Sequence, residues 1–243
     1  MKIIKLDAID STNSFLKEMA QKMDLENFTV VTAASQKKGR GQMGEEWVSE
    51  PSKNLLCSVF VAFDALKITE KRLLNYAVSI AVLNVLKEYE VPKLQVKWPN
   101  DIMSDHDKIC GILIENVMQK KHIKSTVIGL GVNINQLDFP NSLSKVTSVK
   151  RTTKKEVNIE EFLNKLIQEL KGTLKIVSSK DRTILESTYL SLLYKKNIPS
   201  MFKETDNTLF MGKIIGISSV GKLQIQLDNE LIKEFEVKEV SFA

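Results

Sequence analysis

The chain has 243 residues, a net charge of +5 and 43% hydrophobic residues, enough to bury a large core as one domain or as a main domain with a small appendage. No apolar run approaches the roughly 20 residues of a membrane span, and the N-terminus lacks a secretory signal, so we expect a cytoplasmic protein without a membrane partner. The lysines are dispersed rather than clustered in a stripe, so we expect no nucleic-acid partner.

Four helices are predicted from capping residues and apolar spacing. The first covers 11–21, where Ser-Thr-Asn at the start are capping types. The clearest covers 69–89, because its apolar residues recur at helical spacing after a plausible N-cap at Thr69. A third opens at Asn158, and a fourth spans 182–194.

Apolar runs between these helices predict strands, which makes the main body an α+β mixture. Cys57 and Cys110 lie inside such runs, and this favours buried free thiols over a zinc site. The predicted strands cover 28–34, 54–63, 94–97, 109–117 and 125–133.

The pattern of apolar and polar residues changes after Pro199. Short alternating segments separated by turn residues predict a small all-β appendage of about five strands that starts near residue 196. We therefore expect two domains, over residues 1–195 and 196–243, and a β-barrel in the second.

A glycine-rich loop follows the first predicted strand of the body. Gly39, Gly41 and Gly44 surround Arg40, so backbone amides and a guanidinium can approach a phosphate or a carboxylate closely. A plain hairpin turn is an equally good interpretation of the loop alone. Trp47 is either a core aromatic residue or a cover for an adenine ring.

A second polar segment, Lys-Trp-Pro-Asn-Asp over 97–101, precedes Lys108 and an apolar strand. Lys108 is either a solvated loop lysine or a fixed cation over a reacting carboxylate and phosphate, two groups that repel each other. Gly129 and Gly131 would let backbone approach a ligand, although bulge glycines give the same pattern.

Taken together, these motifs resemble those of the biotin protein ligases, also called biotin–[acetyl-CoA-carboxylase] ligases. Five motifs occur in the family's order over roughly residues 7–135. They are Ser11-Thr12-Asn13, Gln36 with the loop Gly39 to Trp47, Lys97 to Asp101, Lys108 to Leu113, and Gly129-x-Gly131-x-Asn133.

The resemblance implies an α+β fold, with a catalytic domain like that of class II aminoacyl-tRNA synthetases and a C-terminal SH3-like β-barrel. It implies that biotin is activated with ATP and Mg²⁺ to biotinyl-5′-AMP. The biotinyl group would then pass to one lysine of a biotin carboxyl carrier protein domain. It also admits a homodimer, because sheet edges in this family can pair.

The resemblance also implies roles for individual residues. Lys108 and Arg40 would be catalytic. The resemblance leaves the base that takes the proton of the incoming lysine unassigned, and Asp101 is a candidate on its chemistry alone. The metal ligands stay unassigned. Biotin would contact Ser11, Thr12, Asn13, Gln36, Arg40, Gly41, Gln42, Lys108 and Gly111, and the nucleotide would contact Gly39, Arg40, Trp47, Asn100, Asp101 and Asn133.

Two departures from the family lead to further expectations. Many members carry arginine at the position of Gln42 and a basic or polar residue at that of Glu45, so we expect a weaker positive field and faster loss of the adenylate. Because the first motif begins at residue 11, we also expect a ligase without a DNA-binding domain. A lipoate–protein ligase, and a non-catalytic ligand sensor or nucleic-acid-binding module on the same core, are the alternatives.

Overall fold

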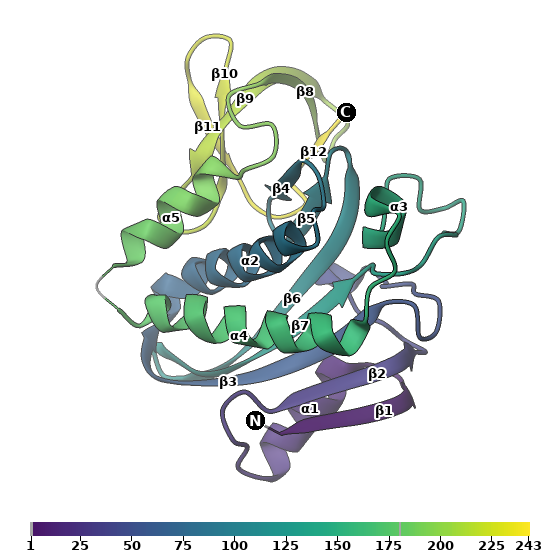
Figure 1. Ribbon diagram of the computed structural model, residues 1–243. Helices are drawn as coiled ribbons and strands as arrows, with labels where there is room; N and C mark the ends of the chain where they lie inside the picture. Colours follow the sequence, from purple (N-terminus) through teal and green to yellow (C-terminus); the bar gives the residue numbers. More distant parts are fainter. Residues whose placement is uncertain (1, 180) are drawn as a thin grey trace.

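Two β-sheets organise the chain in a computed structural model that describes residues 2–179 and 181–243 (Figure 1). The larger sheet has seven strands in the order β1-β2-β3-β7-β6-β5-β4, and the smaller has five in the order β11-β10-β9-β8-β12. The strands are β1 Ile3–Ile9, β2 Val30–Gln36, β3 Leu55–Lys67, β4 Leu94–Lys97, β5 Asp101–Ser104, β6 Asp107–Gln119, β7 His122–Val132, β8 Pro199–Glu204, β9 Leu209–Ile217, β10 Leu223–Leu227, β11 Ile232–Phe235 and β12 Val240–Phe242.

Helices α2 and α4 cover one face of the large sheet (Figure 1). The apolar residues of α4 at positions 162, 166, 170 and 174 are buried, and their spacing of four places them on one side of the helix. α2 packs against the sheet, α4 and α5, which explains why it is apolar around most of its circumference. The helical elements are α1 Thr12–Lys22, η1 Gln42–Gly44, η2 Ile68–Glu70, α2 Lys71–Glu88, α3 Val149–Thr153, α4 Ile159–Val177 and α5 Arg182–Ser191.

The opposite face of the large sheet is only partly covered. α1 packs there against β2, β3 and β7, where Leu16, Val31, Phe60 and Val127 form a second, small core. No helix of the described residues packs on the part of this face over β5 and β6. This part is therefore open to the loop 39–47 and to a ligand.

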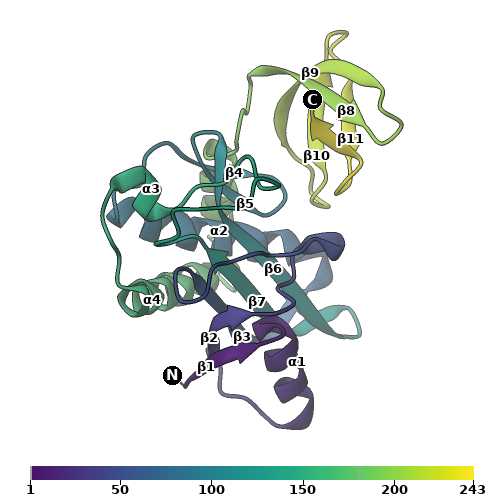
Figure 2. The ribbon, with the colours of Figure 1, turned by 90° about the vertical axis from the view of Figure 1, so that its right-hand side faces the viewer.

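The smaller sheet stands off one end of the larger one, beyond β4 and β5 (Figure 2). The Trp98 indole N–H donates to the carbonyl of Gly221 at 3.2 Å, and the Arg72 guanidinium donates to the carbonyl of Ser219 at 2.9 Å. These bonds fix the smaller sheet to the body. Its edge strands β11 and β12 do not pair with each other within the described residues, so a closed barrel is not formed by hydrogen-bonded strands.

The predicted helix starts are partly correct. Ser11 is the N-cap of α1, and Asn158 caps α4 by accepting from two backbone amides, as expected. The prediction of Thr69 as a cap is wrong, because Thr69 lies inside η2 and Glu70 occupies the N-cap of α2. The carboxylate of Glu70 returns to the amide of Lys67, which closes this extra turn.

Other predicted boundaries are also wrong. α5 ends at Ser191 rather than at residue 194, because Leu192 and Tyr194 exchange backbone hydrogen bonds with Val96 at the edge of the large sheet. The predicted turn 118–124 is mostly strand, since β6 runs to Gln119 and β7 begins at His122. Strand β1 was not predicted, and it pairs in parallel with β2.

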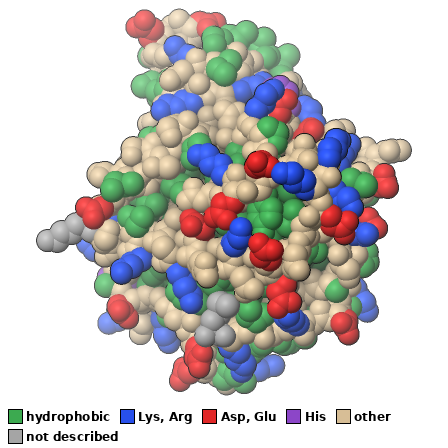
Figure 3. All heavy atoms as spheres, in the orientation of Figure 1, with side chains coloured by type: hydrophobic (Ala, Val, Ile, Leu, Met, Phe, Trp, Pro, Cys, Tyr) green, Lys and Arg blue, Asp and Glu red, His purple; other side chains and the backbone are tan. Residues whose placement is uncertain are grey.

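No helix among the described residues is long and apolar enough to cross a membrane. Basic and acidic side chains are intermixed on the face that carries α2 and α4 (Figure 3). On this face, the charge distribution agrees with the dispersion of lysines along the sequence.

Candidate active site

A cleft of about 610 Å³ opens on the uncovered face of the large sheet. Its walls come from the start of α1, the glycine loop 39–47, strands β5, β6 and β7, and the C-terminal sheet. The predicted site residues that line it are Ser11, Thr12, Asn13, Gln36, Arg40, Gly41, Gln42, Trp47, Asn100, Asp101, Lys108 and Gly111.

Hydroxyl and amide groups form one end of the cleft. Thr12 donates its backbone N–H and its hydroxyl to Oε1 of Gln36, at 2.8 and 3.0 Å. The Ser58 hydroxyl lies 2.8 Å from that of Thr12. No described hydrogen bond uses Nε2 of Gln36, so this amide can donate to a ligand. The Ser11 hydroxyl accepts the amide of Ser14 as the helix cap and keeps its own proton for donation.

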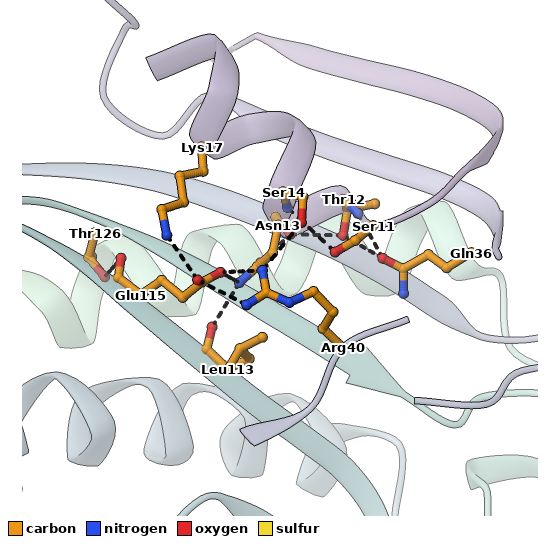
Figure 4. A network of polar contacts seen from close by, with 11 residues as sticks. Ser11, Thr12, Asn13, Ser14, Lys17, Gln36, Arg40, Leu113, Glu115 and Thr126 are labelled. Carbon is orange, nitrogen blue, oxygen red and sulfur yellow. Dashed lines mark hydrogen bonds and ion pairs between the residues drawn. The ribbon is translucent and has the colours of Figure 1, made fainter. Parts of the chain in front are cut away.

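Asn13 is fully engaged by the protein (Figure 4). Its Oδ1 accepts from the Ser58 hydroxyl at 2.6 Å, and its Nδ2 donates to the carboxylate of Glu115 at 3.1 Å. The side chain lies over Gly129, where a Cβ atom would come closer than 3.0 Å to the amide. Gly129 therefore makes room for Asn13, a side chain that the sequence placed against biotin.

Glu115 joins the glycine loop to α1 (Figure 4). Its carboxylate oxygens accept from the two Nη atoms of Arg40 at 3.2 and 3.3 Å, and from Lys17 at 3.1 Å. Burial raises the pKa of Glu115, but the hydrogen bonds from Lys17 and Asn13 and the charges of Arg40 and Lys17 outweigh it, so the pKa lies below its usual value. The carboxylate is therefore charged and holds Arg40 at the edge of the cleft.

Trp47 lies on a pair of glycines. Gly111 of β6 and Gly131 of β7 are direct partners in the sheet, and a Cβ atom at either would come closer than 3.0 Å to the indole ring. The ammonium of Lys108 is 5.6 Å from the centre of the same ring, within the range of a cation–π contact. The two glycines thus form a flat floor for an aromatic side chain.

Lysines gather at the other end of the cleft. Nζ of Lys108 lies 2.6 Å from Oδ1 of Asp101 in an ion pair. Lys97 and Lys145 also line this end, and three ammonium groups around one carboxylate leave an excess of positive charge. Burial lowers the pKa of Lys97; Asp101 opposes this effect, and Lys108, Lys145 and Lys195 add to it. This end is built for an anion with several negative charges.

Two predicted site residues lie outside the cleft. Asn133 is buried and donates to the carbonyl of Thr147 at 3.0 Å, so it fixes the segment after β7. Gly39 accepts the amide of Trp47 at 3.0 Å and closes the base of the loop. Asn100 lines the cleft, but its Nδ2 donates to the carbonyl of Ile112 at 2.7 Å.

Several residues that line the cleft or hold its walls in place were not predicted. Glu115 and Ser58 lie inside apolar strand segments. A lone polar residue in such a segment was the signal that could have identified them. Lys145 lies in a loop without a motif, although its carbonyl accepts the amide of Lys108 at 2.9 Å. Nothing in the sequence indicated that the C-terminal segment lines the cleft. It contributes Phe202, Leu223, Val237, Lys238, Val240, Ser241 and Phe242 to the walls.

The fold and the cleft define an α+β protein that can bind a ligand with a polar head at one end and phosphate groups at the other. Comparison with known proteins gives its family. The profile of the Biotin/lipoate A/B protein ligase family matches residues 6–133, more than half of the chain. The chain belongs to this family, and the resemblance stated from the motifs is confirmed.

Named relatives agree with this assignment. The Bifunctional ligase/repressor BirA of Bacillus subtilis (strain 168) is 28% identical over 236 residues, which cover 96% of this chain and 71% of the relative. The Biotin--[acetyl-CoA-carboxylase] ligase of Paracoccus denitrificans is 28% identical over 163 residues, 65% of this chain and 66% of the relative.

A solved structure is similar along the whole chain. The biotin protein ligase from Aquifex aeolicus in complex with biotin and ATP superposes with a TM-score of 0.80 at 27% identity, and the match covers 100% of this chain and 98% of that one. The catalytic fold expected from the motifs is therefore correct.

Proposed function

We propose that this chain is an ATP-dependent biotin–protein ligase, which activates biotin to biotinyl-5′-AMP and transfers it to a lysine of a biotin carboxyl carrier protein domain. The observation that carries the proposal is a single cleft with a hydroxyl–amide wall at one end and the Lys108–Asp101 pair with Lys97 at the other. Relatives named biotin ligases support it. They also leave the lipoate alternative with less support.

The hydroxyl–amide wall suits the ureido ring of biotin. Nε2 of Gln36 and the hydroxyl of Ser11 can donate to the ureido oxygen, while Ile112 and Leu113 supply apolar wall for the aliphatic chain. Asn13 shapes this end of the cleft through Ser58 and Glu115, and we assign it no direct bond to the ring.

The lysine end suits the reaction centre. One carboxylate oxygen of biotin attacks the α-phosphorus of ATP, a P–O bond forms, and pyrophosphate leaves with the electrons of the broken bond. Lys108, oriented by Asp101, would hold the two negatively charged groups together, and Arg40 would bind the phosphate. In the second step the lysine amine attacks the acyl carbon, AMP leaves, and a base such as Asp101 takes the proton.

The participation of magnesium in the reaction is a proposal. No group of three or more potential metal-binding side chains is found among the described residues, so the chain offers no complete protein cage. Magnesium usually keeps several waters and binds through substrate phosphates with one or two carboxylates. We therefore propose that it enters with ATP.

The domain division, the cellular location and the oligomeric state of the chain are proposals. The five-stranded order of the smaller sheet supports a partly open relative of the SH3-like barrel, and we propose the division into residues 1–195 and 196–243. A cytoplasmic location, a homodimer and the lack of a nucleic-acid partner are proposals as well. Size-exclusion chromatography with light scattering tests the homodimer.

Biotin-dependent exchange of pyrophosphate into ATP tests the function. We expect exchange with the wild-type chain and a loss of at least a hundredfold in Lys108→Ala, because a charge made for the transition state is removed. Lys165→Ala is the control, since Lys165 is about as exposed as Lys108, at 36% against 31%, and pairs with Glu88, and neither Lys165 nor Glu88 lines the cleft. No exchange by the wild type, or equal exchange by Lys108→Ala, would reject the assignment.

Biotin and lipoate are compared by thermal shift. A ligand present at about 100 times its Kd stabilises a protein by about 2.7 kcal/mol, so a thermal-shift titration reports binding directly. We expect biotin to raise the Tm and lipoate to leave it unchanged. A larger shift with lipoate would favour the alternative enzyme.

A further inference from the structure

We propose that Lys238 and Glu45 form a link which holds the glycine loop against the C-terminal sheet and slows the escape of the bound adenylate. The inference rests on the proposed function, because it concerns how long that enzyme keeps its intermediate. Lys238 is a positioning residue in this proposal, since it acts through the loop.

The loop is a closed hairpin in this structure. The amide of Gly41 donates to the carbonyl of Glu45 at 2.6 Å, and the amide of Trp47 donates to Gly39 at 3.0 Å. Met43 and Gly44 at its tip have φ angles of 52° and 82°. A left-handed conformation is strained in a residue with a side chain, so the tip needs support at Met43.

Lys238 supplies that support. Its Nζ donates to the carbonyl of Met43 at 3.0 Å and to the carboxylate of Glu45 at 3.0 Å. The two bonds join residues 195 and 193 positions apart. Lys238 and Glu45 both line the cleft, so the link forms part of its wall.

The turn that carries Lys238 joins β11 to β12, and the sheet of these strands is attached to the body. Besides the bonds from Trp98 and Arg72, the ring of Phe242 lies beneath the ammonium groups of Lys97 and Lys195, at 5.8 and 5.1 Å from its centre. Lys238 therefore ties the glycine loop to a sheet that is bonded to the body.

The link changes the expected effect of Glu45. From the sequence, the extra carboxylate should weaken the positive field of the loop and speed the loss of adenylate. Its charge is instead compensated by Lys238, and it tethers the loop. The side chains of Lys238 and Glu45 are 49% and 69% exposed, so the pair is hydrated and its effect is moderate.

Release of preformed adenylate measures the link. The full chain is loaded with labelled biotin and ATP, separated from free ligand, and followed by filter binding. We expect Lys238→Met to raise the release rate about threefold, which corresponds to about 0.7 kcal/mol at 1.4 kcal/mol per tenfold. Glu45→Gln should have a smaller effect, because the bond from Lys238 to Met43 survives.

The double variant and a matched control decide the interpretation. Glu45→Gln added to Lys238→Met should change nothing further, since both act through one link. Lys233→Met is the control, because Lys233 has similar exposure and pairs with Glu204 inside the same sheet at 2.7 Å. Its release rate should equal that of the wild type.

Three results would overturn the link: unchanged release in Lys238→Met, additive effects in the double variant, or equally fast release in Lys233→Met. If Lys238→Met does not fold, the comparison of Glu45→Gln with the wild type decides, and unchanged release rejects the link. Failure of the wild type to form adenylate at all would instead reject the proposed function.

Discussion

The carboxylate of Glu115 joins strand β6 to the glycine loop and to helix α1. It binds Arg40 of the glycine loop, Lys17 of α1 and the amide of Asn13. The bonds to Arg40, at 3.2 and 3.3 Å, are longer than the 2.7–2.9 Å of strong charge-assisted bonds. A phosphate in the cleft can therefore compete for Arg40, while Lys17 and Asn13 keep Glu115 in place.

Glu115→Gln tests this carboxylate through the pH dependence of stability. The pKa of Glu115 is lowered in the folded chain, so its contribution is present above the unfolded value of about 4.3 and is lost as the pH falls through the folded value. We expect the free energy of unfolding of the variant to fall by about 1 kcal/mol at pH 7, because the ion pairs with both cations are lost. The loss stays small, since both cations become free to hydrate.

Urea unfolding measured from pH 7 downward follows both states of the carboxylate. The difference in the free energy of unfolding between wild type and Glu115→Gln should shrink as the pH falls through the lowered pKa of Glu115. A difference of constant size over this range would show that shape, rather than charge, is what Glu115 contributes.

At the scale of elements, helices of several turns were predicted correctly from the sequence, and the short helix α3 and the edge strand β1 were not. α2 and α4 have long apolar stripes, and their existence follows from spacing alone. β1 is an edge strand with no regular alternation of burial, and α3 has five residues, too few for a helical pattern. Their formation depends on tertiary pairing, which no local window contains.

The paired glycines of β6 and β7 are an element-scale feature with a testable consequence. In Gly131→Ala the new methyl group would collide with the ring of Trp47, so the indole must leave its floor. We expect catalytic efficiency to fall by about tenfold or more, in line with the cost of misplacing a substrate-positioning group by about 1 Å.

Tryptophan fluorescence measures the displacement directly. The chain has two tryptophans, so Trp98→Phe leaves Trp47 as the reporter. Gly172→Ala is the control, because nothing lies within 4 Å of its new methyl group in α4. An unchanged Trp47 spectrum and unchanged activity in Gly131→Ala would contradict the proposed floor.

At the scale of the whole molecule, the motifs predicted one half of the cleft. Residues such as Lys108 and Gln36 carry recognisable chemistry at fixed spacings, and the structure brings them together. The walls from the C-terminal sheet could not be predicted, because Phe242 meets Lys97 only after two sheets dock. Apolar residues of this kind are indistinguishable in sequence from any core.

Arg72 tests the docking of the two sheets. Its guanidinium joins α2 to the carbonyl of Ser219 and also pairs with Glu186 at 3.4 Å. We expect Arg72→Met to cost about 2 kcal/mol, because hydrogen bonds from charged groups are worth about 1.5–3 kcal/mol. The Tm measured by calorimetry should fall by about 4–8 °C.

Arg151→Met is the matched control for this docking. Arg151 also donates to a backbone carbonyl, that of Val146 at 3.3 Å, but the bond stays within one loop. Limited proteolysis between residues 195 and 199 should be faster in Arg72→Met alone. Equal cleavage of both variants would show that the sheets dock without Arg72.

The distribution of cleft walls along the chain has a consequence for biosynthesis. A ribosome completes residues 11–131, which hold the hydroxyl wall, Lys108 and the glycine floor, well before it adds Val237 to Phe242. Since chains fold from the N-terminus as they are made, a nascent chain has an active centre open on one side. We expect water to reach any adenylate formed there, and productive chemistry to begin after the last strand has docked.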